Sequence, residues 1–439
     1  MHASMTTDSR LEGCQLRARF AAALSAMYGA EVPAYTTLVE ISGDVNRDFV
    51  AAHPDAERLG TLDRVTAERH GAIRVGTPDE LADVADLFSA FGMYPVGFYD
   101  LRDAASPVPV VSTAFRPIDT HELARNPFRV FTSMLATADP RFFDGDLRRR
   151  IERSLAARAL FDPELIAQAR TIAADGYCDA ADADDFVGRA VDSFALSREP
   201  IDRVWYDELS AVSAVAADIA GVSRTHINHL TPRVLDIDDL YARMSARGIA
   251  MIDAIQGPPR WSGPDVLLRQ TSFRALAEPR QFRDADGTVA EGTLRVRFGE
   301  VEARGVALTP KGREHYDAAL ADMSAFAQLP GALDPAAVWS RHFPASDAEM
   351  AAQGLAYYYG DDPSKPVVYE DFLPASAAGI FRSNLDTDTS VLATPAADDS
   401  GYSRDWMAGA IGRDLLDPYA LYEAALYGAL TQQTQEISV

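Results

Sequence analysis

The segment Arg69–Glu80, with the sequence RHGAIRVGTPDE, decides the fold because it passes directly from a strand into a helix. Its first half is a short run with apolar and β-branched members, which is typical of a strand. Thr77 and Glu80 then make a capping box with Pro78 at the first helical position, so a helix begins here. An apolar helical stripe and further strand-like runs follow, and together they predict a βαβββ module within residues 60–120.

A second segment repeats this layout. The run Thr225–Leu230 also reads as a strand, a helix follows, and three strand-like runs lead to residue 308. Counted from His70 and from His226, apolar residues fall at the same helical offsets, and a glycine ends each helix at the same distance. The sequence therefore predicts an α+β fold of tandem βαβββ modules, the second at 221–310, whose curved sheets pair into a partial barrel. The first strand of each module would line the shared interior, which places both histidines in one cavity.

The rest of the chain is expected to be mainly helical and to form one catalytic unit with the two modules. Helical stripes without a period-two run occupy residues 140–220, which we interpret as a helical insertion. Residues 311–439 are expected to form a C-terminal helical and lid region. Within it, the loop Asp398–Ser403 would close over the pocket with Ser403 against the substrate, although an ordinary surface turn explains the same residues equally well.

The composition is that of a globular protein with a strongly acidic balance. Hydrophobic residues make up 47% of the chain, and 41 Lys+Arg against 65 Asp+Glu give a formal net charge of −24. Such a field repels nucleic acid and anionic membranes, so an anionic substrate would have to be held by arginines inside a pocket. With no apolar span, no secretory signal near Met1 and only Cys14 and Cys178, a soluble protein of the cytoplasm is expected.

The first strand of each predicted module carries a histidine. His70 and Arg74 are four residues apart, so in a regular strand their side chains point to the same face. A histidine there suits a metal and an arginine suits a carboxylate, whereas a buried histidine bonded to backbone is the alternative. His226 opens the equivalent strand, with Asn228 on its face as a residue that could orient a ligand. His229 should project to the opposite face and is left out of the site.

The third metal ligand is expected on the last strand of the second module. In the run Arg297–Gly305, the residues Glu300, Glu302 and Arg304 alternate onto one face. Carboxylates on an interior face need a partner, which is either a metal or a salt bridge such as one between Glu302 and Arg304. Two histidines and one carboxylate leave open positions on a metal, as in iron(II) oxygenases, whereas zinc would favour hydrolytic or lyase chemistry. The sequence leaves both metals open.

Four longer motifs carry a family resemblance. They are RHGAIR at 69–74, THINHLTPR at 225–233, GEVEARG at 299–305 and ALTPKGR at 307–313. In these motifs the chain resembles the bacterial 2-oxoadipate dioxygenase/decarboxylase family, also called 2-hydroxyglutarate synthase, of the vicinal oxygen chelate superfamily. The likeness extends from the first predicted helix almost to the C-terminus, and the superfamily is consistent with a doubled βαβββ module.

The resemblance implies iron(II) held by His70, His226 and a glutamate, with Arg74 binding a carboxylate of the substrate. The run from Glu300 is also similar to the ligand strand of hydroxyphenylpyruvate dioxygenase, whose metal-binding glutamate precedes an arginine by four residues, which favours Glu300 over Glu302. The implied reaction converts 2-oxoadipate and O2 to D-2-hydroxyglutarate and CO2 in lysine catabolism. The implied partners are O2 and a small 2-oxo dicarboxylic acid, with no nucleic acid and no membrane.

Two other functions are compatible with the same residues. The same fold and metal could act on another 2-oxo acid or on an aromatic substrate, in which case Arg74 would contribute little to activity. A non-catalytic binding or regulatory protein could keep the metal for structure alone, and would unfold when the metal is removed. The sequence does not indicate the oligomeric state, the accepted chain length of the oxo acid or the role of the helical insertion.

Overall fold

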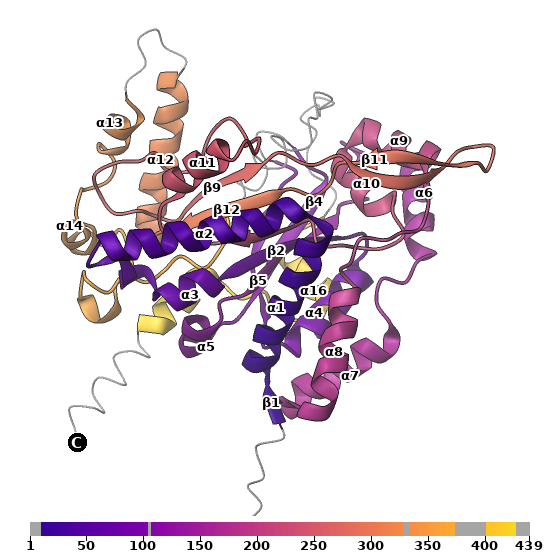
Figure 1. Ribbon diagram of the computed structural model, residues 1–439, viewed down its shortest axis with the longest axis horizontal. Coiled ribbons are helices and arrows are strands. Elements are labelled where there is room, and N and C mark those ends of the chain that lie inside the picture. Colours follow the sequence, from indigo (N-terminus) through magenta and orange to yellow (C-terminus); the bar gives the residue numbers. More distant parts are fainter. Residues whose placement is uncertain (1–9, 104–106, 328–333, 374–400, 427–439) are drawn as a thin grey trace, which may run out of the picture.

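The computed structural model describes residues 10–103, 107–327, 334–373 and 401–426. Within them, helices and strands form an α+β arrangement around one five-stranded sheet, with smaller sheets beside it (Figure 1). Among these residues, no helix is both long and apolar enough to cross a bilayer.

The first βαβββ module forms most of the central sheet. The strand order is β3-β4-β5-β2-β8, with β2 parallel to β5 and antiparallel to β8. Helix α4 is the crossover after β2, and the module extends past residue 120 because its last strand is β5. The elements are β2 Arg69–Val75, α4 Pro78–Ser89, β3 Tyr94–Asp100, β4 Val110–Arg116, β5 Arg129–Leu135 and β8 His229–Pro232.

The ends of α4 follow the predicted local signals. The Thr77 hydroxyl accepts from the backbone N of Glu80 at 3.1 Å, and the Glu80 carboxylate accepts from the backbone N of Thr77 at 3.3 Å. After the helix, Gly92 takes a φ of +65°, a left-handed conformation that favours glycine. These signals fix where the chain leaves β2, the strand that carries His70.

The second module is less regular and joins the first through β8. The backbone of Arg233, just after β8, forms an isolated parallel β-bridge with Glu302 of β12. Strand β12 pairs antiparallel with β9. The first of the three strand-like runs expected after the second helix, at residues 249–255, is reduced to isolated bridges such as that between Met251 and Phe273. Within the described residues the sheets do not close into a barrel. The elements are α11 Ile237–Ala246, β9 Leu268–Phe273, the hairpin β10 Glu278–Arg283 and β11 Val289–Leu294, and β12 Gly299–Arg304.

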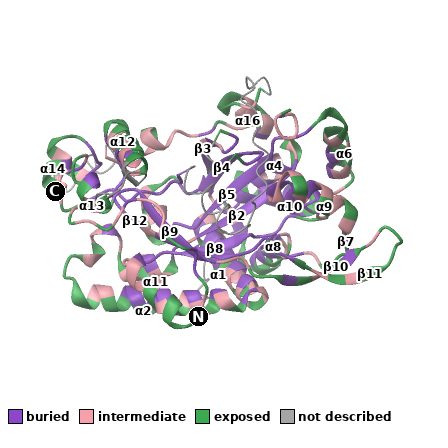
Figure 2. Ribbon diagram, turned by 90° about the horizontal axis from the view of Figure 1, so that it is seen from above, coloured by how far each residue is buried: buried purple, intermediate pink, exposed green. Residues whose placement is uncertain are grey.

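The two faces of the central sheet have different neighbours. Ile73 and Val130 belong to a large apolar core shared with the helices, whereas Ala72 and Phe131 belong to a second core with Phe298, next to β12. Figure 2 shows the sheet as the buried centre of the molecule. The helices of the large core include α1 Gly13–Glu31, α2 Pro33–Ala52, α4, α7 Pro163–Asp175, α8 Ala180–Asp192 and α16 Arg404–Ile411.

Residues 140–220 contain helices and only short strands. The last of these helices, α10, lies against β2 on the side of the second core. The elements are α6 Gly145–Ala156, α7, β6 Tyr177–Asp179, which pairs with β1 Arg10–Glu12, α8, β7 Ile201–Asp202, α9 Arg203–Val212 and α10 Ala214–Ala220. Beyond residue 309 lie α12 Pro310–Ala327, α13 Pro335–Trp339 and α14 Asp347–Ala352.

Candidate metal centre

Three strands bring two histidines and one glutamate together in the interior. His70 of β2, His229 of β8 and Glu300 of β12 each offer one ligand atom, and these atoms all lie within 4.8 Å of one another. His70 Nε2 is 3.3 Å from Glu300 Oε1, and His229 Nε2 is 3.7 Å from Glu300 Oε2. All three side chains are buried. This geometry suits a small cation held by two imidazole nitrogens and a carboxylate.

The second nitrogen of each histidine is also held. His70 Nδ1 lies 2.9 Å from Glu302 Oε2, and His229 Nδ1 lies 2.9 Å from Thr231 Oγ1. Metal-binding histidines usually make such a contact, because it fixes the tautomer and the ring orientation. In both rings Nε2 is therefore the nitrogen turned toward Glu300.

Among the described residues, no arginine pairs with the buried carboxylate of Glu300. The imidazoles of His70 and His229 lie next to it, and Gln270 Nε2 donates a hydrogen bond to it. Burial raises the pKa of Glu300, and the bonds from His70 and Gln270 only partly oppose this. A divalent cation would stabilise this carboxylate in its charged form, so the residues fit a metal.

Glu302 lies behind His70 rather than beside the other two ligand atoms. Arg304 donates to its carboxylate at 2.7 and 2.9 Å, and Arg129 approaches to 3.5 Å. Burial alone would raise the pKa of Glu302, but Arg304 and His70 outweigh it and lower the pKa to about 2. Glu302 is thus an ionised carboxylate at ion-pair distance from the far nitrogen of His70.

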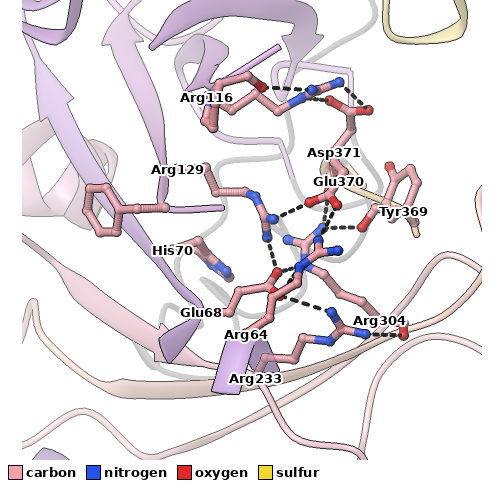
Figure 3. A network of polar contacts seen from close by, with 12 residues as sticks. Arg64, Glu68, His70, Arg116, Arg129, Arg233, Arg304, Tyr369, Glu370 and Asp371 are labelled. Carbon is pink, nitrogen blue, oxygen red and sulfur yellow. Dashed lines mark hydrogen bonds and ion pairs between the residues drawn. The ribbon is translucent and has the colours of Figure 1, made fainter. Parts of the chain in front are cut away.

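A buried network of arginines and acids lies beside His70 (Figure 3). The Glu68 carboxylate forms ion pairs with Arg129 at 2.8 Å and with Arg233 at 2.9 Å. The Glu370 carboxylate forms ion pairs with both Arg64 and Arg129. We call this the arginine network, and its members are Arg64, Glu68, Arg116, Arg129, Arg233, Glu302, Arg304, Glu370 and Asp371. Apart from the Glu302–Arg304 pair, it was not predicted from the sequence, because its residues come from segments far apart in the chain.

His226 lies in a different cluster from His70. Its Nε2 is 3.3 Å from Asp218 Oδ1 and 3.1 Å from the side-chain nitrogen of Asn228, and Arg74 forms an ion pair with Asp218. Burial lowers the pKa of His226 to about 4, although Asp218 opposes the shift. Two of the expected site residues, His226 and Arg74, are thus joined by an aspartate of α10 that the sequence did not reveal.

The expectation that His229 points away from the site is wrong. The regular strand begins at His229 and not at Thr225, so counting alternate residues from His226 does not apply there. In the observed register, His229 lies opposite Ala72, and directly opposed residues share a face. This places His229 on the same face as His70, two residues from Ala72.

Ser403 begins a helix in this structure. Its hydroxyl accepts a hydrogen bond from the backbone N of Trp406 at 3.1 Å, which caps α16, and the side chain is exposed. Residues 398–400 of the expected lid loop lie outside the described residues. The contact that Ser403 makes is therefore that of a helix cap.

Comparisons with known sequences identify relatives of this chain. The chain matches the family model described as 2-oxoadipate dioxygenase/decarboxylase over residues 20–384. It is 72% identical over 420 residues to the protein of that name from Mycobacterium tuberculosis, covering 96% of this chain and 98% of that protein. It is 41% identical over 449 residues to the protein of that name from Pseudomonas putida, covering 93% of each.

Solved structures of similar proteins point to the same family. The chain is similar to the hydroxyglutarate synthase from Pseudomonas putida in complex with 2-oxoadipate, with a TM-score of 0.82, 36% identity and coverage of 99% and 100% of the two chains. A putative glyoxalase superfamily protein from Ralstonia eutropha shares the fold alone, with a TM-score of 0.51, 22% identity and coverage of 67% and 84%. The expected α+β fold agrees with this likeness. The chain belongs to the 2-oxoadipate dioxygenase/decarboxylase family.

Proposed function

We propose that the chain is an iron(II)-dependent dioxygenase that converts 2-oxoadipate and O2 to D-2-hydroxyglutarate and CO2. The observation that carries this proposal is the buried group of His70, His229 and Glu300, in a chain whose relatives bear the name of that reaction. A similar solved structure holds 2-oxoadipate. The reaction would serve lysine catabolism in the cytoplasm, where the free thiols Cys14 and Cys178 would stay reduced.

Iron(II) would be held by His70 Nε2, His229 Nε2 and the Glu300 carboxylate. A set with His226 in place of His229, as the family resemblance implied, would require residues 225–228 to rearrange, since His226 faces Asp218. When bound, iron(II) supplies open positions for a 2-oxo acid and O2, together with the electrons that activate O2. Glu302 and Thr231 keep the two imidazoles oriented toward that position.

Arg74 would bind the distal carboxylate of the oxo acid. It lies four residues after His70 on β2, so both side chains leave the same face, about 13 Å apart at the backbone. Ala72 lies between them on this face, and its neighbour Phe131 on β5 is apolar, which suits a short aliphatic chain and excludes water. Asp218 pairs with Arg74 and so orients its guanidinium.

Replacing Arg74 by alanine should raise the KM for 2-oxoadipate by about 10–100-fold, because a charge-assisted bond to the distal carboxylate is lost. The matched substrate is 2-oxohexanoate, which has the same carbon number without the distal carboxylate and should be affected little. Steady-state O2 uptake with both acids measures the difference. Equal losses for the two acids would mean that Arg74 does not contact that carboxylate, and would favour a different substrate for the same metal centre.

Replacing Glu302 by glutamine should weaken metal binding by about 10–100-fold, because His70 loses the ionised carboxylate that orients it. Titration of the apo-protein with Co(II), followed by its visible absorption, gives the dissociation constant. The thermal unfolding midpoint of the metal-free variant is the control, because it shows whether the altered contact with Arg304 has destabilised the fold. An unchanged dissociation constant would show that Glu302 does not position His70.

The reaction itself is tested by O2 uptake of apo-protein that has been reloaded anaerobically with iron(II) and given 2-oxoadipate. We expect O2 uptake, CO2 release and 2-hydroxyglutarate in equal amounts, with the products identified by mass and chiral chromatography. Absence of uptake with 2-oxoadipate, 2-oxoglutarate and 2-oxopimelate would contradict the proposal. Unfolding on metal removal, in place of simple loss of activity, would instead favour a structural metal.

A further inference from the structure

A cavity of about 400 Å³ opens beside the candidate metal centre. Its wall is largely aromatic and includes Phe98, Tyr99, Tyr369, Phe372, Tyr419 and Tyr422. Arg313 and Arg404 also line it, together with Asp371 and Asp417, and each of these four side chains is in an ion pair. Such a cavity has the size and the mainly apolar lining of a small-molecule site.

Phe372 is the wall that this cavity shares with the metal centre. Phe372 is one of the residues that line the cavity. The ring also lies edge-to-face with His70, at a centroid distance of 5.0 Å, and 5.1 Å from the ring of Phe131. A molecule in the cavity is therefore one aromatic ring away from a metal-ligand histidine.

The backbone on either side of Phe372 is held firmly. Arg304 donates to the carbonyl oxygens of Tyr369 at 3.0 Å and Asp371 at 2.9 Å, and the Tyr369 hydroxyl donates to the carbonyl of Phe372 at 2.8 Å. Arg116 pairs with the Asp371 carboxylate, as Figure 3 shows. Motion at this wall is thus confined to the Phe372 side chain, and a cavity of about 150 Å³ already accommodates a benzene ring, so this larger one has room for it.

A second cavity, of about 270 Å³, reaches His226 instead. His226 contacts Asp218 and Asn228, and it does not belong to the group formed by His70, His229 and Glu300. This second cavity thus reaches His226 and no residue of that group, and it serves as the comparison for the first.

We propose that the aromatic cavity is the vestibule through which the 2-oxo acid reaches the metal centre, and that rotation of the Phe372 ring into it opens the way. This inference rests on the proposed function, because it assumes a metal at His70, His229 and Glu300. The ring closes the centre against water when the acid has passed, while the arginine network keeps the backbone in place. Phe372 thereby acts on passage and takes no part in the chemistry.

The test is the rate at which 2-oxoadipate binds to the Co(II)-loaded protein without O2, followed by stopped-flow absorbance. Leu416→Trp narrows the aromatic cavity, and Val222→Trp narrows the second cavity at a position that is also half-buried. We expect Leu416→Trp to slow association and dissociation alike by about tenfold or more, with little change in Kd, because a narrowed path affects both directions equally. Phe372→Leu should accelerate both rates, and Val222→Trp should change neither.

Unchanged rates in Leu416→Trp, or slower rates in Val222→Trp alone, would overturn the vestibule. If Leu416→Trp fails to fold, as judged by its thermal midpoint, Phe98→Trp narrows the same cavity from another side. A parent protein that binds no Co(II), or whose spectrum does not respond to 2-oxoadipate, would contradict the proposed function and the vestibule with it. If the parent protein responds to 2-oxoadipate but Leu416→Trp and Phe98→Trp leave the association and dissociation rates unaltered, the vestibule proposal alone is contradicted.

Discussion

Replacing His229 by alanine should abolish metal binding and oxygen uptake while the chain stays folded. His229 Nε2 faces Glu300, and the ligand atoms of His229, Glu300 and His70 lie within 4.8 Å of one another. Loss of one of three ligands should weaken metal binding by more than the roughly 100-fold that marks the upper range for losing a supporting contact. Co(II) titration and O2 uptake with 2-oxoadipate measure the two effects.

The matched control for this variant is His226→Ala, three residues away. Because His226 contacts Asp218 and Asn228, its removal should leave the metal dissociation constant within a few-fold of the parent value, although it should disturb Arg74 through Asp218. The opposite result, with metal binding lost in His226→Ala and kept in His229→Ala, would show that the metal recruits His226. Residues 225–228 would then have to change conformation on metal binding.

Replacing Glu68 by glutamine should lower the free energy of unfolding by about 3–5 kcal/mol, the usual cost of removing one partner from a buried ion pair. Glu68 is fully buried, and Arg129 and Arg233 both pair with it. Its loss removes the carboxylate that pairs with Arg233 and leaves Arg129 with Glu370 and the more distant Glu302. Urea unfolding at pH 7, with the slope checked for two-state behaviour, gives the free-energy difference.

Glu208→Gln is the control for this effect, because the Arg150–Glu208 pair is about 40% exposed and should be worth no more than about 1 kcal/mol. A loss at Glu68 as small as that at Glu208 would mean that the arginine network adds little to stability.

The contribution of Glu68 to stability should also depend on pH. Burial alone would raise the pKa of Glu68, but Arg233, Arg129 and the other arginines outweigh it and hold the folded pKa well below the ordinary glutamate value of about 4.3. A depressed pKa gives stability that is fully present above the unfolded pKa and is lost as the pH falls toward the folded one. The difference between parent and Glu68→Gln should therefore be constant near neutral pH and shrink below about pH 4. A difference that grows on acidification would contradict this assignment.

Local sequence signals predicted the first module and the last strand of the second module well. The capping box at Thr77 and Glu80, the strand containing His70 and the strand containing Glu300 are all present, because each depends on neighbouring residues. Alternation along β12 also indicated that Glu300 and Glu302 share a face, and both carboxylates lie next to His70. Residue periodicity and capping residues are sufficient to predict a helix or strand that is regular.

The errors arose where the chain is irregular or the partner is distant. Nothing in the run from Thr225 to Leu230 indicates that the strand starts only at its fifth residue, His229, because pairing with β2 decides that point. The partner of Arg74 is Asp218, 144 positions along the chain, and Glu370 lies 241 positions from Arg129. Acidic residues at such separations carry no local pattern, so only the folded chain reveals which arginine each one meets.

The arginine network also sets an order of events during synthesis. Its first members precede β2, yet Glu370 and Asp371 are made about 300 residues after His70, a delay of roughly 15–60 s on the ribosome. Until that segment emerges, Arg129 lacks one of its carboxylates and His70 lacks the ring that covers it. A metal that arrives before this segment is made would meet a site that is still open to bulk water. The finished chain is thus the first state in which the proposed iron(II) would be sheltered, and delivery of the metal after release would protect it best.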